Sequence, residues 1–251
     1  MSLAQTSTTA VRRGAGLDLD DVRLGRTEGE ALPGTLRLRI APGELVSVLG
    51  PSGCGKSTLL RTLAGLLPPL AGRVTQDGEP ITGPDADRAL VFQEDALLPW
   101  RSVRANVELP LAIRGAGRAE RRAVAGEWLE RVGLAGHAGK LPRQLSGGQR
   151  QRVQLARALA GEPRAVLMDE PFGALDAHTR AGMQDLLVDM LRGTGATVVF
   201  VTHDVDEALH LGDRIVLLPS GEVLDVPHPR RRDAREASGT TALRRRVLAS
   251  L

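Results

Sequence analysis

The segment 50–58, Gly-Pro-Ser-Gly-Cys-Gly-Lys-Ser-Thr, constrains this chain more than any other feature. The apolar run 44–49 before it is typical of a short buried strand, and residues 59–64 after it are typical of a helix start. A loop of the pattern G-x-x-x-x-G-K-[ST] in this context binds phosphate, because its backbone N–H groups converge on one anion and the helix dipole adds positive potential. The alternative, a glycine-rich turn with an exposed lysine, leaves the flanking strand and helix unexplained. We therefore predict a nucleotide site at this phosphate loop, which consists of Gly50, Pro51, Ser52, Gly53, Cys54, Gly55, Lys56, Ser57 and Thr58.

Length and cysteine content set the broad class. The 251 residues suffice for one large domain or two small ones. No apolar run approaches the roughly 18 residues of a membrane-spanning helix, and residues 1–13 lack the apolar core of a signal peptide, so we expect a flexible polar leader. The single cysteine, Cys54, excludes an intrachain disulfide and fits a reducing compartment.

Direct nucleic-acid binding is not expected. The formal net charge is only +3, aromatic residues make up 2% of the chain, and there is no tyrosine. Sequence-independent binding of single strands depends on aromatic stacking platforms, which are nearly absent here. We attribute the preference for Arg over Lys to genome composition rather than to a nucleic-acid surface.

Hydrophobic patterning predicts alternating strands and helices on either side of a helical stretch. Residues 17–24 and 36–40 alternate apolar and polar side chains, which predicts an antiparallel β piece before the phosphate loop. Further strands are expected at 72–78, 88–92, 165–168, 197–202 and 214–218, with helices at 179–191 and 205–211. Such alternation indicates a mostly parallel sheet covered on both faces, and ligands bind such sheets at the carboxyl ends of the strands. Gly50, Gln93, Asp169 and His203 each follow a strand end, so one crevice is expected to gather them.

The helical stretch is expected at about 94–160. Residues 102–111 are typical of a helix, and apolar residues recur at helical spacing from Val124 to Val132. Trp128 within this stripe is expected to serve core packing only. From 228 the chain becomes Arg-rich, and we expect a surface tail with a short helix near 241–251. Such a run most often marks a solvated tail; the alternative is a tail that binds anionic lipid or RNA.

The string Leu-Ser-Gly-Gly-Gln at 145–149, with the phosphate loop and Asp169-Glu170, resembles the ATP-binding cassette (ABC) ATPases. The resemblance covers residues 17–225 and includes Gln93, the segment 174–176 and His203, in the family's order. It implies an α/β fold, with a P-loop NTPase core of mostly parallel sheet, an N-terminal antiparallel β piece and a helical insertion subdomain. The implied organisation is a leader at 1–16, an ATPase domain at 17–227 with the helical subdomain at about 94–160, and a tail at 228–251.

Two stretches narrow the resemblance. Residues 83–101 and 169–177 are similar to bacterial importers of taurine, sulfonates and nitrate. The resemblance then implies an ATPase peripheral to the cytoplasmic face of the cell membrane, working with transmembrane permease subunits and, indirectly, a periplasmic or lipid-anchored solute-binding protein. The segment 97–100, Leu-Leu-Pro-Trp, is a candidate contact for the permease, with packing of Trp100 on its own subdomain as the alternative. A soluble cassette that acts as an ATP-driven assembly clamp is the alternative function.

The resemblance also implies roles for the site residues. ATP and Mg²⁺ are the expected ligands, in a head-to-tail homodimer where the second copy's 146–149 covers the nucleotide. Lys56 would contact the outer phosphates, and Glu170 would act as general base or orient the attacking water. The other implied roles are metal binding by Ser57, Gln93 and Asp169, a γ-phosphate contact by His203, coupling across the dimer by Asp176, and nucleotide contacts by Ser146, Gly147, Gly148 and Gln149.

One departure from the family concerns the binding of the adenine ring. The family stacks adenine on an aromatic residue before the phosphate loop, whereas residues 22–26 here read Val-Arg-Leu-Gly-Arg. Arg26 is the candidate to stack by its guanidinium plane. We expect weaker ATP binding and modest base selectivity.

Overall fold

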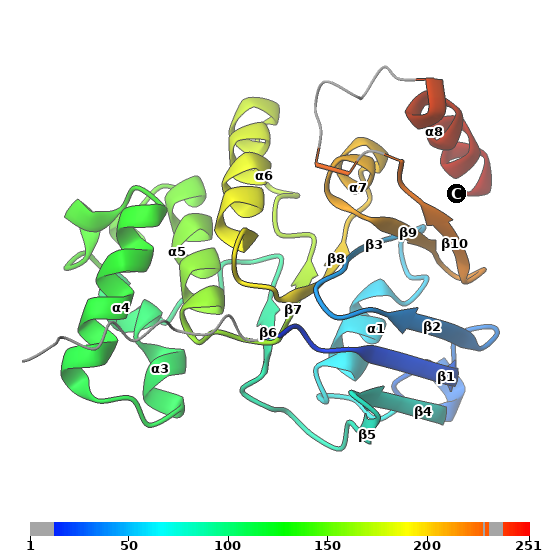
Figure 1. Cartoon of the computed structure of the whole chain (residues 1–251), viewed down its shortest axis with the longest axis horizontal. Helices are drawn as coiled ribbons and strands as arrows, with labels where there is room; N and C mark the ends of the chain where they lie inside the picture. Colours follow the sequence, from blue (N-terminus) through cyan, green and yellow to red (C-terminus); the bar gives the residue numbers. More distant parts are fainter. Residues whose placement is uncertain (1–12, 228, 231–237) are drawn as a thin grey trace, which may run out of the picture.

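A computed structural model describes residues 13–227, 229–230 and 238–251. Figure 1 shows the order and placement of the described elements. The strands are β1 (Leu17–Arg23), β2 (Leu36–Ile40), β3 (Leu45–Leu49), β4 (Ala71–Gln76), β5 (Glu79–Pro80), β6 (Arg88–Val91), β7 (Ala165–Asp169), β8 (Thr197–Val201), β9 (Arg214–Leu217) and β10 (Glu222–Asp225). The helices are α1 (Lys56–Leu63), α2 (Val103–Val107), α3 (Leu109–Ile113), α4 (Arg118–Arg131), α5 (Gly147–Ala160), α6 (Ala177–Leu191), α7 (Val205–Leu211) and α8 (Ser238–Ser250), with short 3₁₀ turns at Glu28–Glu30, Ala135–His137 and Pro142–Gln144.

The central sheet confirms the predicted fold class. Its order is β10-β9-β3-β8-β7-β6, and all of its pairings are parallel except that of β10 with β9. A separate antiparallel sheet, ordered β2-β1-β4-β5, is the predicted N-terminal β piece. The turn between β4 and β5 places Asp77 and Gly78 at positive φ, as a tight hairpin turn requires.

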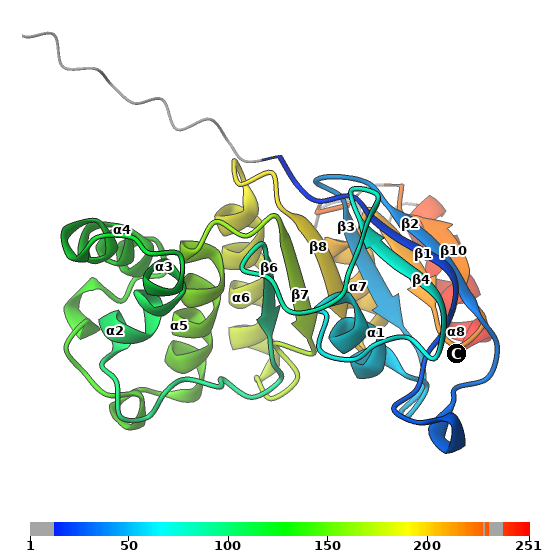
Figure 2. The same cartoon turned by 90° about the horizontal axis from the view of Figure 1, so that it is seen from below.

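Period-two alternation divides the core between the two faces of the central sheet. On β8, Val198 and Phe200 face one hydrophobic cluster, which they share with α5 and α6. Val199 and Val201 face the opposite cluster, where the leucines of α1 pack together with the antiparallel sheet. Helix α1 is therefore held between the two sheets, which fixes the position of the phosphate loop at its N-terminus (Figure 2).

Helices α2 to α5 form a group beside β6, at the other end of the molecule from the antiparallel sheet (Figures 1 and 2). Trp128 is 8% exposed within this group's core, as predicted. The single helix expected at 102–111 is wrong: α2 ends at Val107, Glu108 joins it to α3, and Pro110 lies in the first turn of α3. Proline has no N–H to continue the helical hydrogen-bond ladder, so the chain starts a new helix there.

The described chain ends are anchored to the domain. Most of the predicted leader, residues 1–12, lies outside the described residues, but Ala15 is fully buried and its N–H donates to the Arg164 carbonyl at 3.0 Å. Helix α8 packs Val247, which is fully buried, against the cluster formed by α7, β9 and β10. Neither this contact nor strand β10 was predicted from the sequence. No helix among the described residues combines the length and apolar character needed to cross a membrane.

Candidate functional site

The carboxyl ends of neighbouring parallel strands form a pocket at the phosphate loop. The loop follows β3, Glu170 follows β7, and His203 lies just beyond β8, three strands that are adjacent in the sheet. The pocket, about 300 Å³ in volume, is lined by Gly50, Pro51, Ser52, Lys56, Glu170, His203 and Leu251. We call it the phosphate pocket. The sequence predicted all of these residues except Leu251.

Lys56 is folded back onto the phosphate loop. Its side chain is 8% exposed, and Nζ donates to the carbonyls of Gly50 at 2.7 Å and Pro51 at 3.0 Å. Lys56 is also the first residue of α1, so its ammonium group and the helix N-terminus are next to each other. Gly55 precedes the helix with φ +101°, a conformation that an L side chain rarely adopts. Charge, helix dipole and loop shape together suit an anionic ligand.

Ser57 and Asp169 form the oxygen-rich part of the site. Burial raises the pKa of Asp169 above its usual value, and a hydrogen bond from Ser57 opposes this shift. The contact joins the start of α1 to the end of β7. A hydroxyl and a carboxylate are ligands that Mg²⁺ takes in proteins, usually together with substrate phosphates and water. This pair therefore fits the cation that the sequence analysis assigned to it.

Glu170 and His203 contact each other across two strands. Glu170 Oε2 lies 3.1 Å from His203 Nδ1, and the His203 side chain remains 61% exposed. Glu170 has φ +43°, in the left-handed region, and its N–H donates to the Val201 carbonyl at 3.0 Å. The turn after it is anchored by Phe172, which is 1% exposed and packs its ring against Phe200. The pair has the geometry of a carboxylate base and the group that orients it.

Gln93 follows β6 and reaches the same neighbourhood. A Cβ built on Gly173 would lie 3.7 Å from Glu170 Oε2 and 3.9 Å from Gln93 Nε2, so both side chains approach this glycine. Gln93 itself is exposed and does not line the phosphate pocket.

The segment 145–149 does not lie at the phosphate pocket of its own chain. Ser146 caps α5: its hydroxyl accepts from the Gln149 N–H at 3.3 Å, and Gln149 Oε1 accepts from the Ser146 N–H at 3.0 Å. Gly147 and Gly148 form the first turn of α5, and Ser146 and Gly147 are exposed at its N-terminus. The structure therefore separates two of the predicted nucleotide-binding parts.

Asp176 caps α6 and also lies outside the pocket. Its carboxylate accepts from the N–H groups of Thr179 at 3.0 Å and His178 at 3.1 Å, and the Thr179 bond contributes most to holding the pKa of Asp176 below its usual value. One turn into α6, Arg180 donates to the Leu175 carbonyl at 2.8 Å and pairs with Asp204, the residue after His203, at 3.4 Å. Arg180 thus connects the 174–176 segment to the His203 segment.

Leu32 packs against the phosphate loop. The Leu32 side chain lies over Gly55, with Cδ1 2.0 Å from where a Cβ on that glycine would be. Its N–H donates to the Leu24 carbonyl at 2.8 Å, and it packs with Cys54 on the cluster around α1. Arg26 is exposed. Leu32 carries no periodic signal in the sequence, because it lies in an irregular stretch between two strands.

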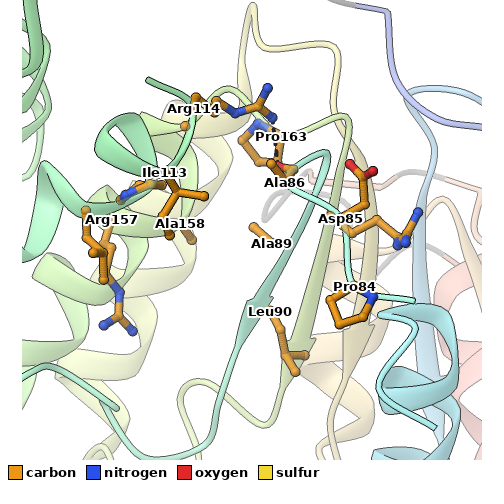
Figure 3. Close-up of a pocket in the computed structure, with 14 residues that line it drawn as sticks. Pro84, Asp85, Ala86, Ala89, Leu90, Ile113, Arg114, Arg157, Ala158 and Pro163 are labelled. Atoms are coloured by element: carbon orange, nitrogen blue, oxygen red, sulfur yellow. Dashed lines mark hydrogen bonds between the residues drawn. The ribbon is translucent and has the colours of Figure 1, made fainter. Parts of the chain in front are cut away.

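A second concavity lies between β6 and the helical group (Figure 3). This groove, about 440 Å³ in volume, has an apolar floor that includes Ala89 of β6, Ile113 of α3 and Ala158 of α5, while Arg114 and Arg157 lie at its margins. Ile113 is 71% exposed. In the segment 97–100, Leu97 is buried in the core but Trp100 is 74% exposed, so Trp100 does not pack on its own subdomain.

Comparisons with known proteins agree with this architecture. A family profile described as "ABC transporter" matches residues 34–173. The chain is 53% identical over 184 residues to the taurine import ATP-binding protein TauB of Yersinia pestis bv. Antiqua (strain Antiqua), which covers 73% of this chain and 72% of that protein. It is 47% identical over 219 residues to the putative ATP-binding protein BAB2_1147 of Brucella abortus (strain 2308), with 84% of each covered. A dimeric structure of MJ0796, titled a bacterial ABC transporter cassette, superimposes with a TM-score of 0.74 at 37% identity and covers 84% of this chain and 99% of MJ0796.

Proposed function

The chain belongs to the ABC transporter family, and on this premise we propose that it is the ATP-hydrolysing subunit of a bacterial importer for taurine, another sulfonate, nitrate or a similar small solute. The observation that carries the enzymatic part is the phosphate pocket, where Lys56 and the Glu170–His203 pair lie together. The relatives' names supply the direction of transport and the solute class.

In this proposal the phosphate loop binds the triphosphate of ATP. Lys56 exchanges its two loop carbonyls for phosphate oxygens, and the N-terminus of α1 supplies backbone donors. Ser57 and Asp169 would hold Mg²⁺, with Gln93 as a further ligand, and the bound ion would neutralise charge on the transferred phosphoryl group. Glu170 orients the attacking water and accepts its proton. His203 has its Nδ1 next to Glu170, which leaves Nε2 for a contact with the γ-phosphate.

The separation of 145–149 from the phosphate pocket supports a head-to-tail dimer. Because this segment does not line the pocket of its own chain, we assign it to a second copy, whose Ser146, Gly147 and Gly148 and the N-terminus of α5 would contact the γ-phosphate. MJ0796, which has the same fold, is itself dimeric in its solved structure. Asp176 does not line the pocket; in this proposal it contacts the second copy and couples the two sites.

We propose the groove as the docking site for a permease. Its apolar floor and arginine margins suit an amphipathic helix, which recognises such a groove through apolar side chains spaced one turn apart. Helix α5 borders the groove and begins within the segment 145–149, so docking in the groove is mechanically connected to the proposed dimer interface. A permease helix would place the chain at the cytoplasmic face of the membrane, and a solute-binding protein would act through the permease alone.

The test is co-purification of a tagged Glu170→Gln variant from its native cells in mild detergent with Mg-ATP, next to wild-type protein without nucleotide. Loss of the base is expected to trap the ATP-bound dimer, with permease subunits attached. Wild-type ATPase activity in proteoliposomes should then rise with taurine and its binding protein. Recovery of soluble proteins alone would contradict the transport proposal and favour the assembly clamp, while loss of ATPase activity in Glu170→Gln would still support the enzymatic part.

A further inference from the structure

The segment 92–96 joins β6 to the helical group and carries Gln93. It has no regular secondary structure, and Gln93 is exposed. Ala96 within it has φ +45°, a left-handed conformation that is uncommon for alanine. A segment of this kind needs external contacts to keep one conformation, and all of the contacts described next come from α5.

Gln154 holds the backbone on both sides of Gln93. Its side-chain Nε2 donates to the carbonyl of Phe92 at 2.9 Å and to the carbonyl of Glu94 at 2.9 Å. Gln154 is 1% exposed. An amide nitrogen has two N–H donors, and here they are placed on the carbonyls directly before and after the Gln93 residue.

Two arginines on the same helix make further hydrogen bonds to the segment 92–96. Arg150 Nε donates to the Asp95 carboxylate at 2.6 Å, and Arg157 Nη1 donates to the Ala96 carbonyl at 2.8 Å. Positions 150, 154 and 157 have the i, i+4, i+7 spacing that places side chains on one face of a helix. This face of α5, which we call the clamp, therefore contacts four of the five residues in the segment 92–96.

Core packing alone does not explain Gln154. Its neighbours on α5, Val153, Leu155 and Ala156, are buried and apolar, and an apolar residue could fill the same space without the cost of burying an amide. The amide instead supplies hydrogen-bond donors to the part-buried carbonyls of Phe92 and Glu94, which would be costly to leave without partners.

We propose that Gln154 is a positioning residue for Gln93, and that the clamp makes the segment 92–96 move with α5 as one body. The proposal rests on the proposed function, because it takes Gln93 as a contact of the metal and the attacking water. A second copy at the N-terminus of α5, or a permease in the groove, can displace α5. The Gln93 backbone would then move with the helix. The clamp thereby determines whether Gln93 is in place when the nucleotide is covered.

The test compares Gln154→Met, which keeps the length and removes both donors, with Arg152→Met in the full-length protein. Arg152 is on the same helix and also bonds a backbone carbonyl, that of Val132 at 3.3 Å, away from the segment 92–96. For Gln154→Met we expect kcat to fall about tenfold with KM for ATP within about twofold of wild type. The Mg²⁺ concentration for half-maximal rate should rise about threefold, because a ligand held less firmly binds more weakly. Arg152→Met should match wild type in all three.

Two further measurements separate positioning from a general loss of structure. In a Gln93→Ala background, Gln154→Met should cost little more activity, since the group that it positions is already absent. Hydrogen exchange of a peptide covering 92–98 should speed up in Gln154→Met and not in Arg152→Met, a readout that does not require activity. Should Gln154→Met fail to fold, Arg157→Met, at the edge of the clamp, should show the same pattern more weakly.

Unchanged exchange at 92–98 in Gln154→Met, or additive losses with Gln93→Ala, would overturn the proposal. A wild-type protein without Mg²⁺-dependent ATPase activity would instead contradict the proposed function, and exchange would still decide whether the clamp exists.

Discussion

The ring pair of Phe172 and Phe200 offers a test of how the turn after Glu170 is supported. The ring centroids lie 5.9 Å apart at an interplanar angle of 43°, and the two residues are 1% and 0% exposed. Phe200 belongs to β8, whose backbone is hydrogen-bonded to β3 on one side and β7 on the other. Phe172 lies in the turn after Glu170, where the ring is the main buried anchor.

Replacing either ring by leucine removes the same contact. A tilted aromatic pair at this separation contributes about 1 kcal/mol beyond its buried area, and the incompletely filled space costs about a further 1 kcal/mol. Each of Phe172→Leu and Phe200→Leu should therefore lose about 2 kcal/mol of unfolding free energy. The double variant should lose about 3 kcal/mol rather than about 4, because the pair interaction is lost only once.

The two variants should differ in catalysis although they match in stability. The strand ladder fixes the backbone of Phe200, so Phe200→Leu should keep kcat within about twofold, whereas Phe172→Leu loosens Glu170 and should lower kcat about tenfold. Urea unfolding at constant m-value and steady-state ATPase assays measure the two effects. Equal losses of kcat in both variants, or fully additive stability losses, would refute the reasoning.

Three other outcomes are expected. Leu32→Ala removes the side chain that packs over Gly55 of the phosphate loop, so the Kd for MgATP should rise about threefold. The ratio of ATP to GTP affinity should stay unchanged in calorimetric titrations. Burial raises the pKa of Glu207 above 4.5, so the folded state holds this proton more tightly than the unfolded chain. The unfolding free energy of the wild type should therefore fall as pH rises from about 4.5 through the folded-state pKa. Urea unfolding of Glu207→Gln should lack this part of the decline. Arg180→Gln, which removes the link between the 174–176 segment and the segment after His203, should lower kcat about fivefold with KM unchanged. Arg192→Gln, which breaks an exposed ion pair at the end of the same helix, should match wild type in the same assay.

Local patterns in the sequence were sufficient for most of the fold. Alternating apolar residues located β1 and β2, and short apolar runs located β3, β7 and β8, because burial on one or both faces of a sheet leaves those signatures. The phosphate loop, Asp169-Glu170 and His203 were found from motif and position after a strand, and parallel strands necessarily bring such residues to one edge. Their distances and side-chain partners needed the structure.

The features that the sequence did not predict depend on contacts between distant segments. In the sequence, Gln154 is one polar residue among several in a helix. Its hydrogen bonds to the segment 92–96 become apparent only once the structure shows that this segment runs across α5. Leu32 has no periodic neighbours, and its role follows from packing on Gly55. The break at Glu108 was predictable in principle from Pro110, but the apolar pattern on both sides of it concealed the boundary. Strand β10, with its short run of mixed polarity, carries too little periodic signal to identify.

The position of Leu251 in the lining of the phosphate pocket has a practical consequence for handling this protein. An affinity tag, fluorophore or fusion partner attached after Leu251 would emerge where the nucleotide enters and where a second copy would close. The other described end is safer: Arg164, just before β7, donates to the Arg13 carbonyl at 2.9 Å, so Arg13 lies at the edge of the sheet opposite the site. Surface immobilisation through the N-terminus should therefore preserve nucleotide binding, whereas the same chemistry at the C-terminus should impair it.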